Sequence, residues 1–275
     1  MNEQEKSDGI KRVIPARYNR LMTDPLLREI VSGLDGVAEA LAAKQQANVL
    51  FDELGTPPPD YAREAAGFIG SGKVDKDWIG RVAKDELAKL VRAEQRKHVS
   101  DLINGCLTQL DSIAEYSVDD VLAELDTRLQ ELVQPLYAAG EKLTGVDTPT
   151  DAIRRGLTEE WRLFADAAIE YAKIRAAQKI AVSVAPEEFK DRGQSAACED
   201  PHANSSVIAN IAEVWESWNT PPQAELAWSD NDEGDRVARW VRPRVEAPWP
   251  VQTDEFLLWC IRNDAELRVP DLGQM

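Results

Sequence analysis

SVDDVLAELDTRLQELVQPLYAAGEKL, residues 117–143, has the clearest helical pattern in the chain. Its leucines recur at intervals of three and four residues, which places them along one side of an α-helix. Such a heptad pattern is typical of helices that pack knobs-into-holes. Ser117 resembles a capping-box start, and Pro135 predicts a kink because it removes one backbone donor. We predict that the leucines form a self-association seam, made of Leu122, Leu125, Leu129, Leu132, Leu136 and Leu143.

The chain before this stretch and for some 40 residues after it also has helical character. Residues 23–25, Thr-Asp-Pro, predict a helix start, and the apolar positions from 27 to 54 continue it until a proline run at 57–59. A long helix is expected from 75 to 116, either bare or bent where residues 92–97 are almost wholly polar. We therefore predict a mainly α fold, with a flexible basic arm at 1–22 and an elongated bundle or coiled-coil hairpin at 23–185.

The last part of the chain differs in composition. Residues 186–206 have no periodicity and predict a linker. Six of the eight tryptophans follow it, among prolines and acidic residues, which predicts a small, mostly irregular and α module at 207–275. Those tryptophans either form a private core or dock onto another surface. The candidates for partner binding are Trp215, Trp218, Trp228, Trp240 and Trp249.

Charge limits the classes of partner. The formal net charge is −17, and residues 186–275 hold 8 Lys/Arg against 18 Asp/Glu. Such a surface repels phosphate backbones, so we expect no nucleic-acid binding beyond weak contacts of the basic N-terminal arm. The sequence has no apolar run of membrane-spanning length and no secretory signal, and its three cysteines lie far apart. These features predict free thiols and a cytoplasmic protein, or a virion component if phage-encoded.

Three short motifs suggest chemistry but lack the context that the chemistry needs. Residues 67–73 match the phosphate-loop spacing, yet Val74 stands where a magnesium-binding Ser or Thr is required. Cys198 and His202 supply one pair of zinc ligands where a structural site needs two pairs. The acidic run 230–235 does not have the glycine and glutamate positions of a calcium loop. We therefore predict no catalytic residues, no metal and no cofactor.

Long helices with a heptad seam, strong acidity and no catalytic constellation favour interaction over catalysis. In this overall character the chain resembles virion-assembly and accessory proteins of bacteriophages and prophages, and the resemblance implies an assembly role. The sequence therefore predicts a non-enzymatic, self-associating assembly or adaptor protein, with protein partners and no membrane partner. Two alternatives stay open: an acidic inhibitor or nucleic-acid mimic that binds a basic partner, and a nucleotide-binding enzyme that uses Gly67–Lys73.

Overall fold

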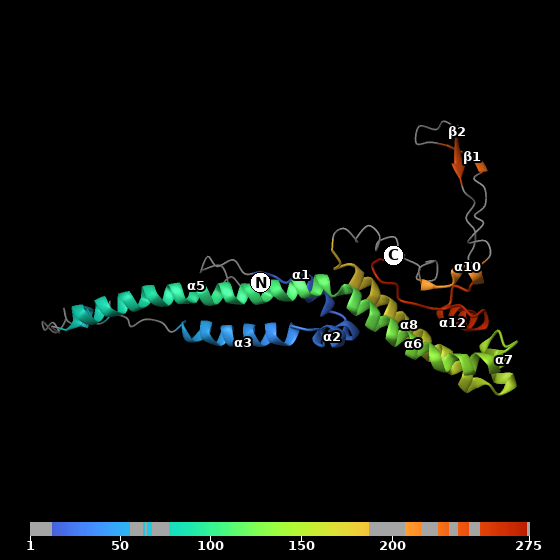
Figure 1. Ribbon diagram of the computed structural model, residues 1–275, viewed down its shortest axis with the longest axis horizontal. Helices are drawn as coiled ribbons and strands as arrows, with labels where there is room; N and C mark the ends of the chain where they lie inside the picture. The colour runs from blue at the N-terminus through green and yellow to red at the C-terminus, as the bar shows by residue number, and fades with distance from the viewer. Residues whose placement is uncertain are drawn as a thin grey trace. The chain divides into compact units, whose positions relative to one another are not determined.

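The computed structural model describes residues 13–55, 63, 65–67, 77–186, 207–215, 225–230, 236–241 and 248–273, the two strands by their backbone. The predicted mainly α fold is confirmed (Figure 1). The helices are α1 (Ala16–Leu21), α2 (Pro25–Ser32), α3 (Val37–Glu53), α5 (Trp78–Tyr116), α6 (Val118–Lys142), α7 (Pro149–Arg155), α8 (Thr158–Val182), α10 (Ile211–Val214) and α12 (Thr253–Arg262). The strands are β1 (Glu225–Asp230) and β2 (Arg236–Val241).

Two compact units divide the chain, with boundaries that differ from those the sequence predicts. Unit 1 comprises residues 1–22 and 31–115, and unit 2 comprises residues 23–30 and 116–275. The segment predicted as one helical domain, 23–185, is thus shared between the units. The tryptophan-rich segment belongs to unit 2 because α12 packs against both α6 and α8. The predicted linker, 186–206, lies outside the described residues after its first position.

Unit 1 is built on α5, which continues as one 39-residue helix through its polar stretch at 92–97. Helix α3 runs beside it, and the Arg96 guanidinium of α5 lies 4.5 Å above the Phe51 ring of α3. The helix expected from 25 to 54 is interrupted at Gly36, whose φ of 83° favours glycine. A Cβ at Gly36 would lie 3.3 Å from the Ile113 Cδ1 of α5. The interruption therefore coincides with a close approach to α5.

The N-terminal residues 13–22 are docked on α5. The prediction of a flexible arm is therefore wrong for this part of residues 1–22. Tyr18 and Leu21 are buried, at 7% and 1% exposure. Helix α1 has no cap of its own, and Asp111 of α5 supplies one, accepting from the backbone N–H of Arg17 at 2.7 Å and of Tyr18 at 3.2 Å. The Arg17 guanidinium also pairs with Glu115 at 3.0 Å. Residues 1–12 lie outside the described residues.

We expect Asp111→Ala to loosen the docking of residues 13–22 by about 1 kcal/mol, because two N–H groups at the start of α1 lose their acceptor. Amide hydrogen exchange at Arg17 and Tyr18 measures the effect and should accelerate roughly fivefold. Asp101→Ala is the matched control, since Asp101 is exposed on the same helix. Unchanged exchange at the start of α1 in Asp111→Ala would contradict the capping role.

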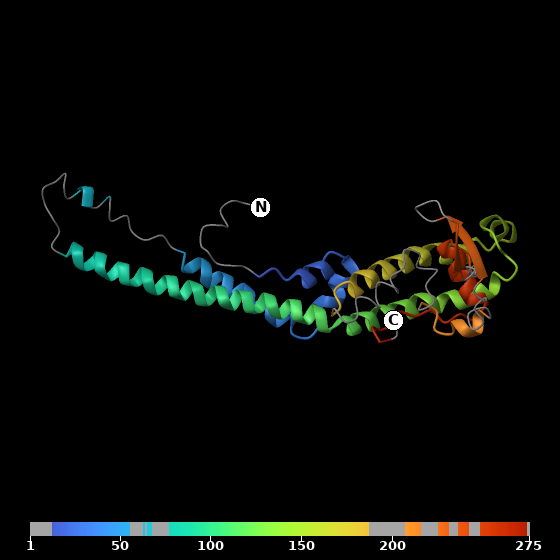
Figure 2. The ribbon, with the colours of Figure 1, turned by 90° about the horizontal axis from the view of Figure 1, so that it is seen from above.

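Unit 2 is built on a hairpin of α6 and α8, which lie side by side in both views (Figure 1; Figure 2). The helices run antiparallel, since Lys142 at the end of α6 pairs with Glu160 at the start of α8 at 3.0 Å. The short helix α7 joins them, begun by Thr148, whose hydroxyl oxygen accepts from the Asp151 N–H. Helix α6 contains Pro135 and continues to Lys142.

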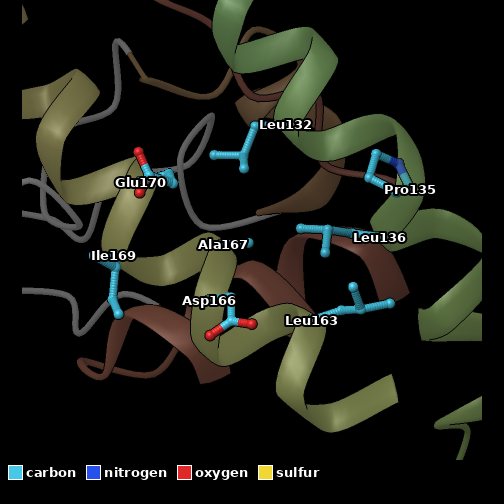
Figure 3. Close-up of a pocket in the computed structure, with 8 residues that line it drawn as sticks. All are labelled: Leu132, Pro135, Leu136, Leu163, Asp166, Ala167, Ile169 and Glu170. Atoms are coloured by element: carbon cyan, nitrogen blue, oxygen red, sulfur yellow. The ribbon is translucent and has the colours of Figure 1, made fainter. Parts of the chain in front are cut away.

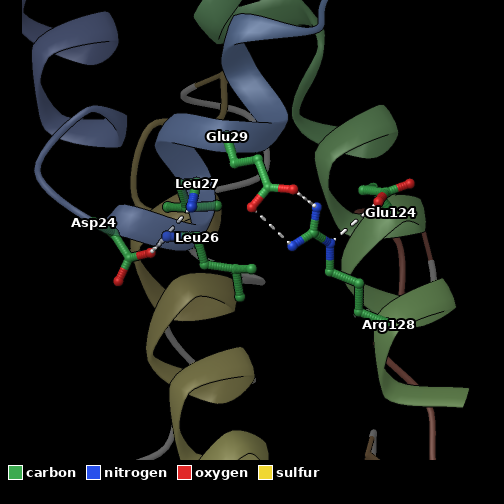
Figure 4. Close-up of polar contacts among 6 residues, drawn as sticks. All are labelled: Asp24, Leu26, Leu27, Glu29, Glu124 and Arg128. Atoms are coloured by element: carbon green, nitrogen blue, oxygen red, sulfur yellow. Dashed lines mark hydrogen bonds and ion pairs between the residues drawn. The ribbon is translucent and has the colours of Figure 1, made fainter. Parts of the chain in front are cut away.

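The residues 23–30 attach to this hairpin by a cap and an ion pair (Figure 4). Asp24 accepts from the backbone N–H of Leu26 at 2.9 Å and of Leu27 at 3.0 Å, as the Thr-Asp-Pro sequence predicts. Arg128 of α6 donates to Glu29 at 2.9 Å and to Glu124 at 3.1 Å. The hydrogen bond from Arg128 lowers the pKa of Glu29.

After α12, residues 264–273 lie as an extended segment on α6 and α8, held by side chains that bind its backbone. Asp126 accepts from the Val269 N–H at 2.7 Å, and Asp119 accepts from the Leu272 N–H at 2.9 Å. Gln130 donates to the Leu267 carbonyl at 2.7 Å. Every second residue from 265 to 269 is buried, which is the pattern of an extended chain against an apolar surface.

The remaining regular structure is a two-stranded antiparallel hairpin of β1 and β2, in a segment expected to be extended or irregular. Its register runs from Glu225 opposite Val241 to Asp230 opposite Arg236. None of the helices in the described ranges is both long and apolar enough to cross a membrane.

Candidate interaction surfaces

The six leucines of the predicted self-association seam lie between α6 and α8 within unit 2. Five of them are at most 1% exposed, namely Leu122, Leu125, Leu129, Leu136 and Leu143. Leu132 is half-buried. The buried face of α8 supplies the other side of this core, with Trp161, Phe164, Ala167, Tyr171 and Ile174. A second copy can therefore reach the seam only if the hairpin opens.

Two of the five candidate tryptophans belong to an aromatic cluster inside unit 2. Trp249 is 7% exposed and meets Trp215 edge-on, with ring centroids 5.3 Å apart. Trp249 also contacts Phe256 of α12 at 6.2 Å, and Phe256 in turn contacts Tyr171 of α8 at 6.0 Å. The cluster thus joins the C-terminal part of the chain to the hairpin.

The other three candidate tryptophans are not described at side-chain level. Trp218 lies outside the described residues, and Trp228 and Trp240 lie on β1 and β2, of which only the backbone is described. Their role as partner-binding residues stays a prediction.

Most residues of the three chemical motifs also lie outside the described residues. Gly67 is helical and exposed, and residues 68–73 of the phosphate-loop match are not described. The same holds for Cys198 with His202 and for residues 231–235. Among the described residues, no group of three or more His, Cys, Asp or Glu side chains is placed to hold a metal ion. Cys106 and Cys260 are free and buried, and burial raises the pKa of the Cys260 thiol.

One buried cation fastens the C-terminal segment. Arg175 of α8 is 8% exposed and donates through Nη1 to Gln178 at 2.8 Å and to the Arg268 carbonyl at 2.9 Å. Its guanidinium lies 4.8 Å over the Tyr171 ring. Burial raises the pKa of Tyr171, and the neighbouring Arg175 opposes that rise. These contacts give Arg175 a structural role in holding residues 264–273.

The first half of α5 presents an apolar surface that the described part of the chain leaves exposed. From Trp78 to Val99 no residue of this helix is buried. Four large apolar side chains are at least half exposed: Ile79 at 70%, Leu87 at 65%, Leu90 at 69% and Val91 at 50%. We call these four residues the α5 stripe. Leu87, Leu90 and Val91 are neighbours at i+3 and i+4 spacing, and clustered exposed apolar side chains of this size are typical of sites where another protein binds.

The sequence contains a signal for the α5 stripe, but it is easily misread. Taken as a single list, Ile79, Val82, Leu87, Leu90 and Val91 look like one apolar face. At about 100° per residue, however, Leu87 lies about 140° around the helix from Val82. In the structure Val82 is half-buried and Leu87 is exposed, so the helix has two apolar faces. Only the face that carries Val82 is partly covered.

Unit 2 has a second apolar surface, a groove of about 340 Å³ between α6 and α8 (Figure 3). Leu136 and Ala167 are buried beneath it, whereas Leu163 and Ile169 are 45% and 59% exposed. The lining consists of Leu132, Pro135, Leu136, Leu163, Asp166, Ala167, Ile169 and Glu170. Its two charged side chains are both carboxylates.

Both apolar surfaces suit the binding of another polypeptide, and neither carries a constellation of catalytic side chains. Comparison with models of protein families, with curated proteins and with solved structures gave no match.

Proposed function

We propose that this protein is a self-associating assembly or adaptor protein whose copies pair through the α5 stripe. The observation that supports it is the exposure of Ile79, Leu87, Leu90 and Val91 on a helix with no buried residue from 78 to 99. Fully burying a large aliphatic side chain contributes about 1.5–3 kcal/mol, so even partial burial of four in each copy favours association.

The charges beside the α5 stripe favour a second copy as the partner. Lys84 and Glu94 lie ten residues apart on either side of Leu87 and Leu90. If two α5 helices pair antiparallel about a two-fold axis near residue 89, Lys84 of one copy lies opposite Glu94 of the other. The same register places Leu87 opposite Val91, so one alignment pairs opposite charges and apolar side chains together. A two-fold interface of this kind closes as a dimer.

The test is the double variant Leu87→Asp/Leu90→Asp, measured by light scattering after size-exclusion chromatography over a hundredfold concentration range. The wild-type chain is expected to gain mass with concentration. The variant is expected to stay monomeric at the concentrations at which the wild type is dimeric, because two carboxylates on each copy would face each other across the α5 interface. Its fold should be retained, since both positions are exposed.

The matched control is Gln45→Asp/Gln46→Asp, which adds the same two charges at exposed positions of α3, the helix whose Phe51 meets α5 at Arg96, on the side opposite Leu87. It is expected to associate as the wild type does. A wild-type chain that is monomeric at every concentration would contradict the proposal, as would equal association of wild type and Leu87→Asp/Leu90→Asp.

A further inference from the structure

The groove between α6 and α8 has two carboxylates, Asp166 and Glu170, among its lining residues (Figure 3). Asp166 and Glu170 are one turn apart on α8, with side chains 67% and 54% exposed. Acceptors above an apolar floor fit a partner segment that carries both cations and aliphatic side chains.

The cations already near this edge leave the carboxylates open to competition. Arg162 lies 3.6 Å from Asp166, and Lys173 lies 2.7 Å from Glu170. Both pairs are within α8, and all four side chains are more than half exposed. Exposed pairs of this type contribute little, because water and salt screen them and both side chains lose freedom. An incoming cation can therefore replace them at small cost.

The chain itself contains a segment with the complementary composition. Residues 9–14 read Gly-Ile-Lys-Arg-Val-Ile, two adjacent cations among three aliphatic residues. The chain as a whole is acidic, with a net charge of −17. Residues 9–14 contain two cations and no acidic residue, so their charge is opposite to that of the groove edge. The described end of the segment exposes its apolar side chains, with Val13 at 38% and Ile14 at 75%.

We propose that the groove binds residues 9–14 of a second copy of this chain, with Lys11 and Arg12 at Asp166 and Glu170 and the aliphatic side chains over Leu136 and Ala167. This inference rests on the proposed self-association and adds a contact of a different symmetry. The arm and the groove are different surfaces, so the contact is heterologous and can continue from copy to copy, whereas pairing through α5 closes as a dimer.

The first test uses a fluorescein-labelled peptide of residues 9–15, titrated with full-length protein and followed by fluorescence anisotropy. Wild type and Leu87→Asp/Leu90→Asp are expected to bind it equally, because the groove lies on other helices than the α5 stripe. Asp166→Lys/Glu170→Lys is expected to weaken binding about tenfold, since two attractions become repulsions. Asp120→Lys/Glu159→Lys makes the same change of charge at exposed positions outside the groove lining and is expected to bind like wild type.

The second test is a charge exchange in the full chain, read as mass by light scattering. Lys11→Glu/Arg12→Glu and Asp166→Lys/Glu170→Lys should each remove association beyond the dimer. The quadruple variant that combines both changes should restore it, because the signs again match. If the double variants lost association because each was misfolded, combining them would not restore it. Rescue therefore indicates charge pairing.

Each outcome separates this contact from the α5 pairing. Peptide binding without any wild-type self-association would contradict the α5 proposal and would also overturn the assignment of the groove to a second copy. If Leu87→Asp/Leu90→Asp abolishes self-association and the wild type does not bind the peptide, only the arm–groove contact is overturned. Equal weakening by the groove and control charge changes would also overturn it, showing a general attraction to the acidic surface. Peptide binding without rescue in the quadruple variant would overturn the assignment to a second copy and leave another basic protein as the occupant.

Discussion

Leu129→Asp is expected to destabilise unit 2 by more than about 4 kcal/mol, a large share of the 5–15 kcal/mol typical of a domain. Leu129 is 0% exposed within the α6–α8 core. Removing a buried leucine costs about 2–5 kcal/mol, and an aspartate adds the penalty of placing a carboxyl in an apolar site. Chemical unfolding followed by tryptophan fluorescence measures the change, since Trp161 and Trp249 both belong to this unit.

The matched control is Ile169→Asp, because Ile169 is 59% exposed on α8 of the same hairpin. Its effect should stay below about 1 kcal/mol. The two variants also distinguish an intramolecular core from a self-association seam. If Leu129→Asp yields a folded chain that merely changes its mass, the leucines join copies, and the account of the core is wrong.

Gly140→Val is expected to destabilise unit 2 by about 2 kcal/mol, because α12 packs too closely for a side chain there. A Cβ at this position would lie 2.6 Å from Cγ2 and 3.5 Å from Cβ of Ile261, so the clash involves the stem of that side chain. The gain from replacing a helical glycine, at most about 1 kcal/mol, offsets only part of the cost. Thermal unfolding of the variant and the wild type measures the difference.

A second substitution tests the cause. Ile261→Ala removes the Cγ2 atom that a side chain at position 140 would strike, so Gly140→Val should cost less in that background than in the wild type. Gly105→Val is the control, since no atom lies within 4 Å of a Cβ at Gly105 of α5. Simple additivity of the Gly140 and Ile261 changes would contradict the proposed close packing of α12 on α6.

The helices of unit 2 were predictable because their signals are local. The 3–4 spacing of apolar residues on α6 and α8 gives each helix one buried face, and Asp24 and Thr148 begin α2 and α7 through bonds to residues two or three positions away. Such patterns depend on the helix geometry alone. The break at Gly36 was missed because the apolar spacing continues across it.

What covers each apolar face could not be predicted, because periodicity does not name the partner. The leucines of α6 satisfy the same heptad rule whether α8 or another copy lies opposite them. The contacts that position the ends of the chain are equally non-local. Asp111 caps α1 across more than 90 residues of sequence, and Asp126 holds Val269 across 143. No local signal marks such residues, since each is an ordinary aspartate on the polar side of a helix.

The candidate surfaces follow from combining sequence with burial. The residue spacing in the sequence shows that α5 has two apolar faces at different angles around the helix. Only the exposed fractions of the side chains show which face is uncovered. The groove on unit 2 depends on Leu163 and Ile169, which interrupt the polar side of α8 six residues apart. The basic segment at residues 9–14 is visible in the sequence alone, and the acidic edge that complements it requires the fold.

The antiparallel pairing of α5 can be measured by disulfide cross-linking of variants with one introduced cysteine, in a chain whose native Cys106, Cys198 and Cys260 are replaced by alanine. Leu90→Cys lies close to the expected two-fold axis, so mild oxidation should link two copies of that variant. Ile79→Cys is equally exposed on the α5 stripe but lies about ten residues from the axis. It should not link to the same position of the second copy. Efficient dimer formation by Leu90→Cys with none by Ile79→Cys is the predicted result. Equal linking of both variants would indicate a parallel arrangement, and failure of both would contradict pairing through α5.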